Sequence, residues 1–301
     1  MTVSALEGAE LVLADGGIET RIIYEFGRAI PKFEAFSLLD DAPGREILRT
    51  IYASYADVAK RYDLPIQLGT PTWRASRHWT GDVERCNRSA VAFLREVAER
   101  AGVRASIAGV IGPSRDGYDP DAGVSDELAY QYHREQAHIL ASCGVDLLYA
   151  PTFPAFSELL GVARAMAETA IPYAIAPMLH PDGTLLDGTP LDEAITRIDA
   201  SIVPGPRHYM IGCLYPTHAQ TALAAARTRN PHAVTRVAGL KANASPLPPE
   251  QLERLGRLSA EPPERFATDL WTCARDFDLR VLGGCCGTDQ HHIEAIAAQA
   301  F

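Results

Sequence analysis

A regular alternation between short apolar runs and longer stretches with helical spacing is the feature that most constrains the fold. Each apolar run is followed by glycine, proline or polar residues, as expected of a strand that ends in a loop. Near-continuous apolar runs of this length are typical of parallel strands that are covered on both faces. Eight such strands are predicted, at 11–14, 65–68, 106–111, 146–150, 173–178, 209–212, 237–241 and 279–282.

The stretches between the strands carry apolar residues at helical spacing. The stretch 45–61, for example, has an apolar stripe made of Ile47, Leu48, Ile51, Tyr55 and Val58. Further helices are predicted at 89–101, 126–142, 157–169, 191–201, 217–228 and 290–300, with two more in 248–277 broken at Pro262-Pro263. Eight strand-then-helix units indicate an α/β chain, with a single (β/α)8 TIM barrel domain over residues 1–301. A doubly wound sheet is the alternative.

The composition narrows the class of protein. A formal net charge of −10 argues against a nucleic-acid surface, which needs clustered lysine and arginine. The apolar runs stay far below the roughly 20 residues of a membrane span, and residues 1–10 lack the basic and apolar regions of a signal peptide. Six cysteines, two of them adjacent, do not resemble a disulfide framework. We therefore expect a cytoplasmic protein, with a homo-oligomer as an open option.

Three of the six cysteines follow predicted strands. Cys213 comes directly after 209–212, and Cys285 and Cys286 follow 279–282 within a glycine-rich turn. The carboxyl ends of barrel strands face one mouth, where the active sites of such barrels lie, so the three sulfurs are expected to meet there. Three thiolates can hold one zinc ion and leave its fourth position open, which is the form of a reaction site. Simple packing of the thiols and a phosphate-binding glycine turn are the alternatives.

Other polar residues follow the same strand ends. Asp15 ends the first predicted strand, so it either contacts a polar group of a substrate or caps the turn at Gly16-Gly17. Glu19 could share that role. His291-His292 follows the cysteine turn and could support the metal ligands. Three cysteines in or beside predicted helices are expected to be inert: Cys86, Cys143 and Cys273.

Taken together, these motifs resemble the homocysteine S-methyltransferase family, whose zinc-dependent thiol methyltransferases have a barrel like that of betaine–homocysteine methyltransferase. The resemblance covers almost the whole chain. Its most specific part is Gly283-Gly-Cys-Cys-Gly-Thr288 followed by His292-Ile-Glu-Ala-Ile296. Four further segments are similar to family elements: Asp15-Gly-Gly-Ile-Glu-Thr20, Gly109-Val-Ile-Gly-Pro113, Ile211-Gly-Cys213 and Asn243-Ala-Ser245.

The resemblance implies a zinc ion held by Cys213, Cys285 and Cys286, with no catalytic residue beyond this metal centre. It implies transfer of a methyl group from a sulfonium-type donor, S-methylmethionine or S-adenosylmethionine, to a zinc-bound thiol such as homocysteine, giving methionine. Betaine stays open as a donor, whereas a methylfolate donor would need a second barrel. The partners are then small molecules, a thiol acceptor and a methyl donor. Substrate contacts are expected from Asp15, Gly16, Gly17, Glu19, Trp73, Thr152 and Asn243.

Three departures from the family pattern concern the acceptor. Pro151 stands where the family has a glutamate that holds the amino group of homocysteine, and Trp73, beside the cation Arg74, replaces a tyrosine. Gly212 replaces an asparagine, and Glu158 lies nearby in the sequence but about one turn into the next predicted helix. These departures indicate an altered acceptor, such as a thiol without a free amino group or a selenol.

Two other functions stay open at this point. A zinc-bound water could hydrolyse a small substrate, although no neighbouring general base is evident in the sequence. The chain could instead bind zinc and thiols without catalysis, since Pro151 and Trp73 depart from the family pattern.

Overall fold

The strands close into a barrel. The computed structural model describes residues 11–117, 119 and 124–301. Neighbouring strands are all parallel and follow the chain order, and β8 returns to pair with β1, which confirms the predicted (β/α)8 barrel. The expectation about a signal peptide in residues 1–10 lies outside the described residues. The strands are β1 (Val12–Ala14), β2 (Ile66–Gly69), β3 (Ala105–Val110), β4 (Leu147–Phe153), β5 (Tyr173–Pro177), β6 (His208–Gly212), β7 (Val237–Ala242) and β8 (Val281–Gly284).

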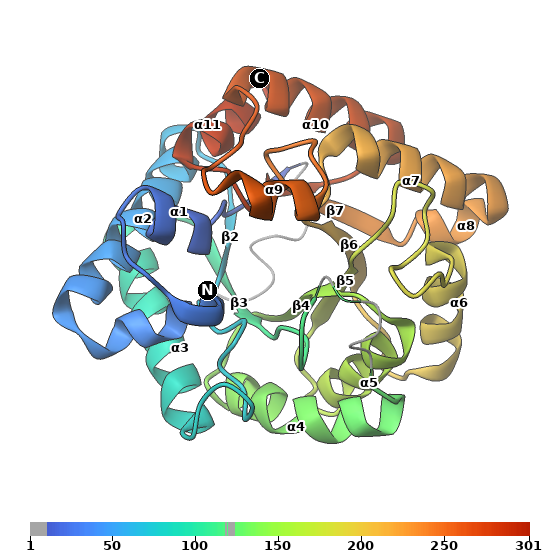
Figure 1. Cartoon of the computed structure of the whole chain (residues 1–301), viewed down its shortest axis with the longest axis horizontal. Coiled ribbons are helices and arrows are strands. Elements are labelled where there is room, and N and C mark those ends of the chain that lie inside the picture. Colours follow the sequence, from blue (N-terminus) through green and yellow to red (C-terminus); the bar gives the residue numbers. More distant parts are fainter. Residues whose placement is uncertain (1–10, 118, 120–123) are drawn as a thin grey trace.

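Helices surround the barrel as a ring (Figure 1). The long helices match the predicted ones, whereas α1, α8 and two short 3₁₀ turns were not predicted, since segments of three to six residues are too short for a periodic pattern. No helix within the described ranges is long and apolar enough to cross a membrane. The helices are α1 (Glu19–Tyr24), η2 (Pro31–Phe33), η3 (Ala35–Asp40), α2 (Ala42–Arg61), α3 (Val83–Ala101), α4 (Asp126–Ser142), α5 (Phe156–Ala167), α6 (Leu191–Ser201), α7 (Pro216–Arg229), α8 (Pro231–Val234), α9 (Pro249–Leu255), α10 (Pro263–Phe277) and α11 (Gln290–Ala298).

Side chains alternate between two cores along each strand, because successive residues of a strand point to opposite faces. In β1, Leu13 belongs to the large core between the sheet and the helices, whereas Val12 and Ala14 belong to a smaller core that fills the barrel. Tyr149 of β4 and Met210 of β6 are further members of the inner core. Both faces of the sheet are therefore apolar, which explains why the strands appear in the sequence as continuous apolar runs.

Side-chain caps fix the starts of several helices. Asp41, Asp82 and Ser125 each accept a hydrogen bond from a backbone N–H in the first turn of α2, α3 and α4. Asp289 forms a capping box with His292 at the start of α11. These caps satisfy N–H groups that have no partner inside a helix, and they place the strand-to-helix loops that form the barrel mouth.

A glycine brings α5 into close contact with α4. A Cβ atom added at Gly161 would lie 2.4 Å from the Cβ of Ala129 and 2.5 Å from the carbonyl oxygen of Asp126. We expect Gly161→Ala to lower the free energy of unfolding by about 1–3 kcal/mol, because overpacking outweighs the better helix propensity of alanine. Urea denaturation measures this. Gly81→Ala, where an added Cβ meets nothing within 4 Å, is the control, and equal losses in both variants would contradict the prediction.

Candidate metal centre and pocket

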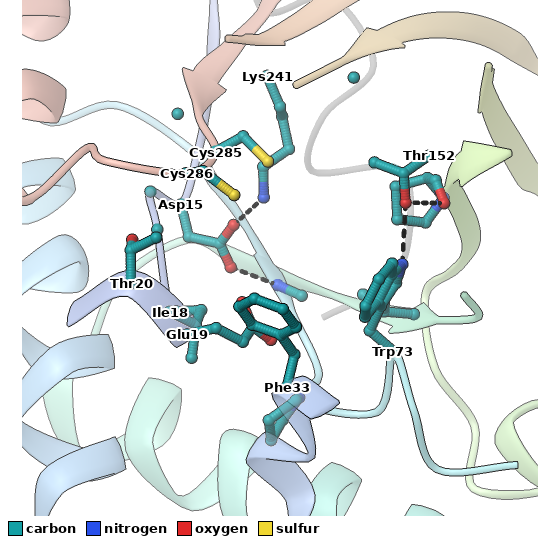
Figure 2. Close-up of a pocket in the computed structure, with 18 of the residues that line it drawn as sticks. Asp15, Ile18, Glu19, Thr20, Phe33, Trp73, Thr152, Lys241, Cys285 and Cys286 are labelled. Atoms are coloured by element: carbon teal, nitrogen blue, oxygen red, sulfur yellow. Dashed lines mark hydrogen bonds and ion pairs between the residues drawn. The ribbon is translucent and has the colours of Figure 1, made fainter. Parts of the chain in front are cut away.

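A pocket opens at the carboxyl ends of the strands, the end at which the active sites of such barrels lie. It is lined by the loops after β1, β2 and β8 and by residues from β3, β4, β6 and β7. Figure 2 shows Cys285, Cys286, Asp15 and Lys241 on one side of it, and Trp73 with Thr152 on the opposite side. Eight of the predicted site residues line this pocket: Asp15, Gly16, Gly17, Glu19, Trp73, Thr152, Cys285 and Cys286.

The three thiols meet at this end of the barrel, as the strand ends predicted. The sulfur atoms of Cys213, Cys285 and Cys286 all lie within 4.8 Å of one another. Backbone hydrogen bonds between neighbouring loops hold them. The N–H of Cys285 donates to the carbonyl of Ala242 at 2.7 Å, and the carbonyl of Cys286 accepts from the N–H of Ala244 at 2.9 Å. Cys213 has a φ of 50°, a left-handed conformation that non-glycine residues rarely adopt.

The donor set fits a thiophilic divalent metal. In a tetrahedral zinc site with Zn–S bonds of about 2.3 Å, the sulfurs lie roughly 3.8 Å apart, so small adjustments would complete the present cluster. Without a cation, the hydrogen bond to Cys213 and burial raise the pKa of both Cys285 and Cys286 well above the ordinary thiol value. A bound divalent cation would stabilise the thiolates and so offset the free energy needed to ionise these thiols. Asn243, buried behind the pocket, points its amide nitrogen at the sulfur of Cys213, 3.6 Å away.

The glycines of the cysteine turn allow a tight junction between the first and last units of the barrel. An added Cβ at Gly284 would lie 2.0 Å from the hydroxyl oxygen of Thr288. That hydroxyl donates to the carbonyl of Cys285 at 2.7 Å and accepts from the N–H of Gly17 at 2.9 Å. The hydroxyl of Thr20 accepts from the N–H of Gly287 at 3.1 Å. The loop after β1 is thus fastened directly to the turn that carries two of the thiols.

Asp15 does not present a free carboxylate to the pocket. One of its oxygens forms a short ion pair with the ammonium of Lys241, and the other accepts from the N–H of Gly69 at 2.7 Å (Figure 2). The Asp15 side chain is only 2% exposed and that of Lys241 15%. The expected contact between Asp15 and a substrate therefore has to compete with the partly buried Lys241.

A tryptophan and its neighbours form the opposite wall. The indole N–H of Trp73 donates to the hydroxyl of Thr152 at 2.9 Å, and that hydroxyl donates to the carbonyl of Pro151 at 2.6 Å. Thr152 has a φ of 65°, next to an irregularity in the pairing of β4 with β5. The guanidinium of Arg74 stacks 4.0 Å from the Trp73 ring and 4.2 Å from the Trp79 ring. Arg74 therefore supports the wall from behind and is not among the residues that line the pocket.

Glu19, at the start of α1, is the second carboxyl group that lines the pocket. Burial raises the pKa of Glu19 from 4.5 to about 7, with smaller effects from Lys241, Asp15 and Cys213. The unfolded chain releases this proton near pH 4.5, whereas the folded chain holds it up to about pH 7. In that window the folded state binds more protons, so the free energy of unfolding falls as pH rises.

This shift gives a prediction for the metal-free protein. Between pH 4.5 and pH 7, Glu19 is expected to lower the free energy of unfolding by about 3 kcal/mol at most. Urea denaturation across this range should show the decline in the wild type and its loss in Glu19→Gln. Parallel curves for the two proteins would show that the Glu19 carboxyl titrates normally in the folded state.

Several other sequence candidates lie away from the pocket. His292 bonds to Asp289 and to the carbonyl of Glu261, and Asp289 already occupies the N–H groups at the start of α11, which leaves little for a phosphate. Glu158 is buried against His133 and the N–H of Ser114, so it does not replace the missing glutamate at 151. Of the cysteines expected to be inert, Cys86 and Cys273 lie within α3 and α10, and Cys143 directly follows α4.

Several pocket residues were not anticipated from the sequence, and three of them carry the site's character. Lys241 is the last residue of a predicted strand, and only this position could have indicated that it belongs to the site. Tyr149 lines the pocket with a buried hydroxyl that makes no hydrogen bond in the described structure. Phe33 reaches the pocket from η2, 45% exposed (Figure 2). Its short turn carries no periodic pattern from which the contact could be predicted.

Comparison with known sequences identifies a protein family and a curated relative with the same description. The family model described as homocysteine S-methyltransferase matches residues 12–300. A curated protein, homocysteine S-methyltransferase YbgG of Bacillus subtilis, is 26% identical over 208 residues, which are 61% of this chain and 56% of YbgG. The match thus spans little more than half the length of that relative.

Among solved structures, the metallated form of homocysteine methyltransferase MmuM from Escherichia coli superposes with a TM-score of 0.76 at 20% identity, covering 99% of both chains. Its apo form gives a TM-score of 0.70 at 22% identity, covering 98% of this chain and 97% of MmuM. At this level of identity, the two structures support the barrel fold.

Proposed function

Since this chain belongs to the homocysteine S-methyltransferase family, we propose that it transfers a methyl group from a sulfonium-type donor to the sulfur of a small thiol such as homocysteine. S-Methylmethionine and S-adenosylmethionine are the proposed donors. The observation that carries the proposal is the cluster of three thiols at the pocket, within 4.8 Å of one another. We assign Cys213, Cys285 and Cys286 as zinc ligands and the whole chain to one barrel domain. A reducing compartment such as the cytoplasm would keep these thiols available.

The chain's own residues prepare the site for a thiolate. When bound, zinc would keep the acceptor sulfur deprotonated at neutral pH. The ammonium of Lys241 favours the ionised form of Cys285. Asn243 offers an N–H to Cys213. On the other side, Trp73, supported by Arg74, forms an apolar wall that excludes water from the path between donor and acceptor.

The proposed reaction is a displacement at carbon. A lone pair of the acceptor sulfur forms the new S–C bond while the S–CH₃ bond of the sulfonium breaks, and the donor leaves as a neutral thioether. The thiol proton passes to solvent. No general base has to act on the methyl group, so the contribution of the pocket is to hold the two sulfur atoms in line with the carbon.

The test combines a zinc-loaded sample with a panel of donors and thiols. Each proposed donor is incubated with homocysteine and with other small thiols, and products are identified by mass spectrometry. We expect one methylated thiol and one demethylated donor per turnover, which for S-methylmethionine with homocysteine means two molecules of methionine. Neither product is expected in a sample stripped of metal. A sample that retains zinc but forms no methylated thiol from any pair would refute the proposed function.

A further inference from the structure

The carboxylate of Asp15 already forms an ion pair within the protein. Both oxygens of Asp15 have partners, the ammonium of Lys241 and the N–H of Gly69. With side-chain exposures of 2% and 15%, Asp15 and Lys241 form a largely buried pair. Separating a buried pair leaves an uncompensated charge, which is strongly unfavourable. An ammonium group of a substrate would have to share Asp15 with Lys241, a cation that already binds it.

Beyond this pair, the pocket offers an ammonium group the uncharged hydroxyl of Tyr149 and polar atoms that already have a partner. The carbonyl of Pro151 accepts from Thr152, whose hydroxyl also accepts from Trp73, so these polar atoms already have partners within the wall. Glu19 is the remaining carboxyl, and its burial disfavours the charged form. Lys241 reaches the same pocket, so a second cation would meet a like charge there.

We propose that the acceptor is a thiol without an ammonium group, and that Lys241 sets this preference by occupying Asp15. As a statement about the substrate, this preference rests on the proposed methyl transfer. The preference itself is one of binding affinity, so it can be measured without turnover. Homocysteine and 4-mercaptobutanoate make a matched pair of probes, because they share the thiol, the carbon chain and the carboxylate and differ only in the ammonium group.

The first measurement is calorimetric binding of each probe to the zinc-loaded protein, followed by kcat/KM with a working donor. We expect 4-mercaptobutanoate to bind at least about tenfold more tightly than homocysteine, as a charge left badly paired in a buried site would cause. Equal or tighter binding of homocysteine overturns the inference. If 4-mercaptobutanoate binds more tightly but no donor gives product, the proposed methyl transfer is wrong, whereas the inference that the site prefers thiols without an ammonium group stands.

Two variants test whether Lys241 causes the preference for thiols without an ammonium group. Lys241→Met should free one oxygen of Asp15 for the ammonium of homocysteine and shift the affinity ratio toward homocysteine by about tenfold or more. Lys241→Arg keeps a cation there and should preserve the wild-type ratio. Thermal unfolding supplies a readout independent of activity, because homocysteine should stabilise Lys241→Met more than 4-mercaptobutanoate does. An unchanged ratio in a folded, zinc-containing Lys241→Met or Lys241→Gln protein contradicts the role of Lys241.

Discussion

Replacing Cys285 with serine is expected to abolish methyl transfer and to weaken zinc binding by more than about 100-fold. Cys285 lies within 4.8 Å of the two other thiols, so its loss leaves two sulfur donors for the metal. A serine hydroxyl is smaller, and it stays protonated where a thiol ionises on binding zinc. Zinc content after gel filtration, a competition titration with a chelator and the initial rate of product formation measure the effect.

Cys143→Ser is the matched control, since it makes the same chemical change in a thiol that directly follows α4, outside the cluster. Its zinc content and rate should match those of the wild type. Thermal unfolding of the metal-free proteins separates loss of the ligand from loss of the fold. Full zinc content in Cys285→Ser would remove this residue from the metal site.

Asp15→Ala is expected to lower the free energy of unfolding of the metal-free protein by about 2–4 kcal/mol, because it leaves the partly buried Lys241 without its carboxylate partner. Urea denaturation at neutral pH measures the loss. Glu84→Ala breaks the ion pair with Arg88, whose two side chains are 50% and 64% exposed, and should cost no more than about 1 kcal/mol.

A double variant tests the reason for the loss. In Asp15→Ala with Lys241→Met, both charges are gone, so much of the stability lost in Asp15→Ala should return. If the double variant were as unstable as the sum of the single ones, the ion pair would not be the cause. The loss would then come from the hydrogen bond between Asp15 and the N–H of Gly69.

The barrel could be predicted from the sequence because its physical cause is local. A strand covered on both faces must be apolar throughout, and this requirement marks eight positions along the chain. The thiol cluster could be predicted for the same reason, since closure of the barrel brings the ends of β6 and β8 to one mouth. The family resemblance then supplied the chemistry that strand positions alone leave open.

The pairing inside the pocket could not be predicted in this way. Lys241 and Asp15 are 226 residues apart, and their contact depends on the lengths and directions of two side chains inside a closed barrel. Tyr149 lies in an apolar run, where a tyrosine is as common as a leucine. No feature of the sequence therefore indicated that its hydroxyl would be buried without a hydrogen bond. The position of Phe33 in the pocket depends on the path of the irregular segment 25–41, and this path is defined only in the folded chain.

The closure of β1 against β8 also sets when the site can form during synthesis. A ribosome releases Asp15 and Gly17 long before their partners Lys241 and Thr288, which follow 226 and 271 residues later. Until then, Asp15 has no cation to pair with and the thiol cluster lacks two of its members. Contacts between such distant residues are slow to form. The cluster of three thiols can therefore form only after Cys286 has been synthesised, and so can the zinc site that we propose there.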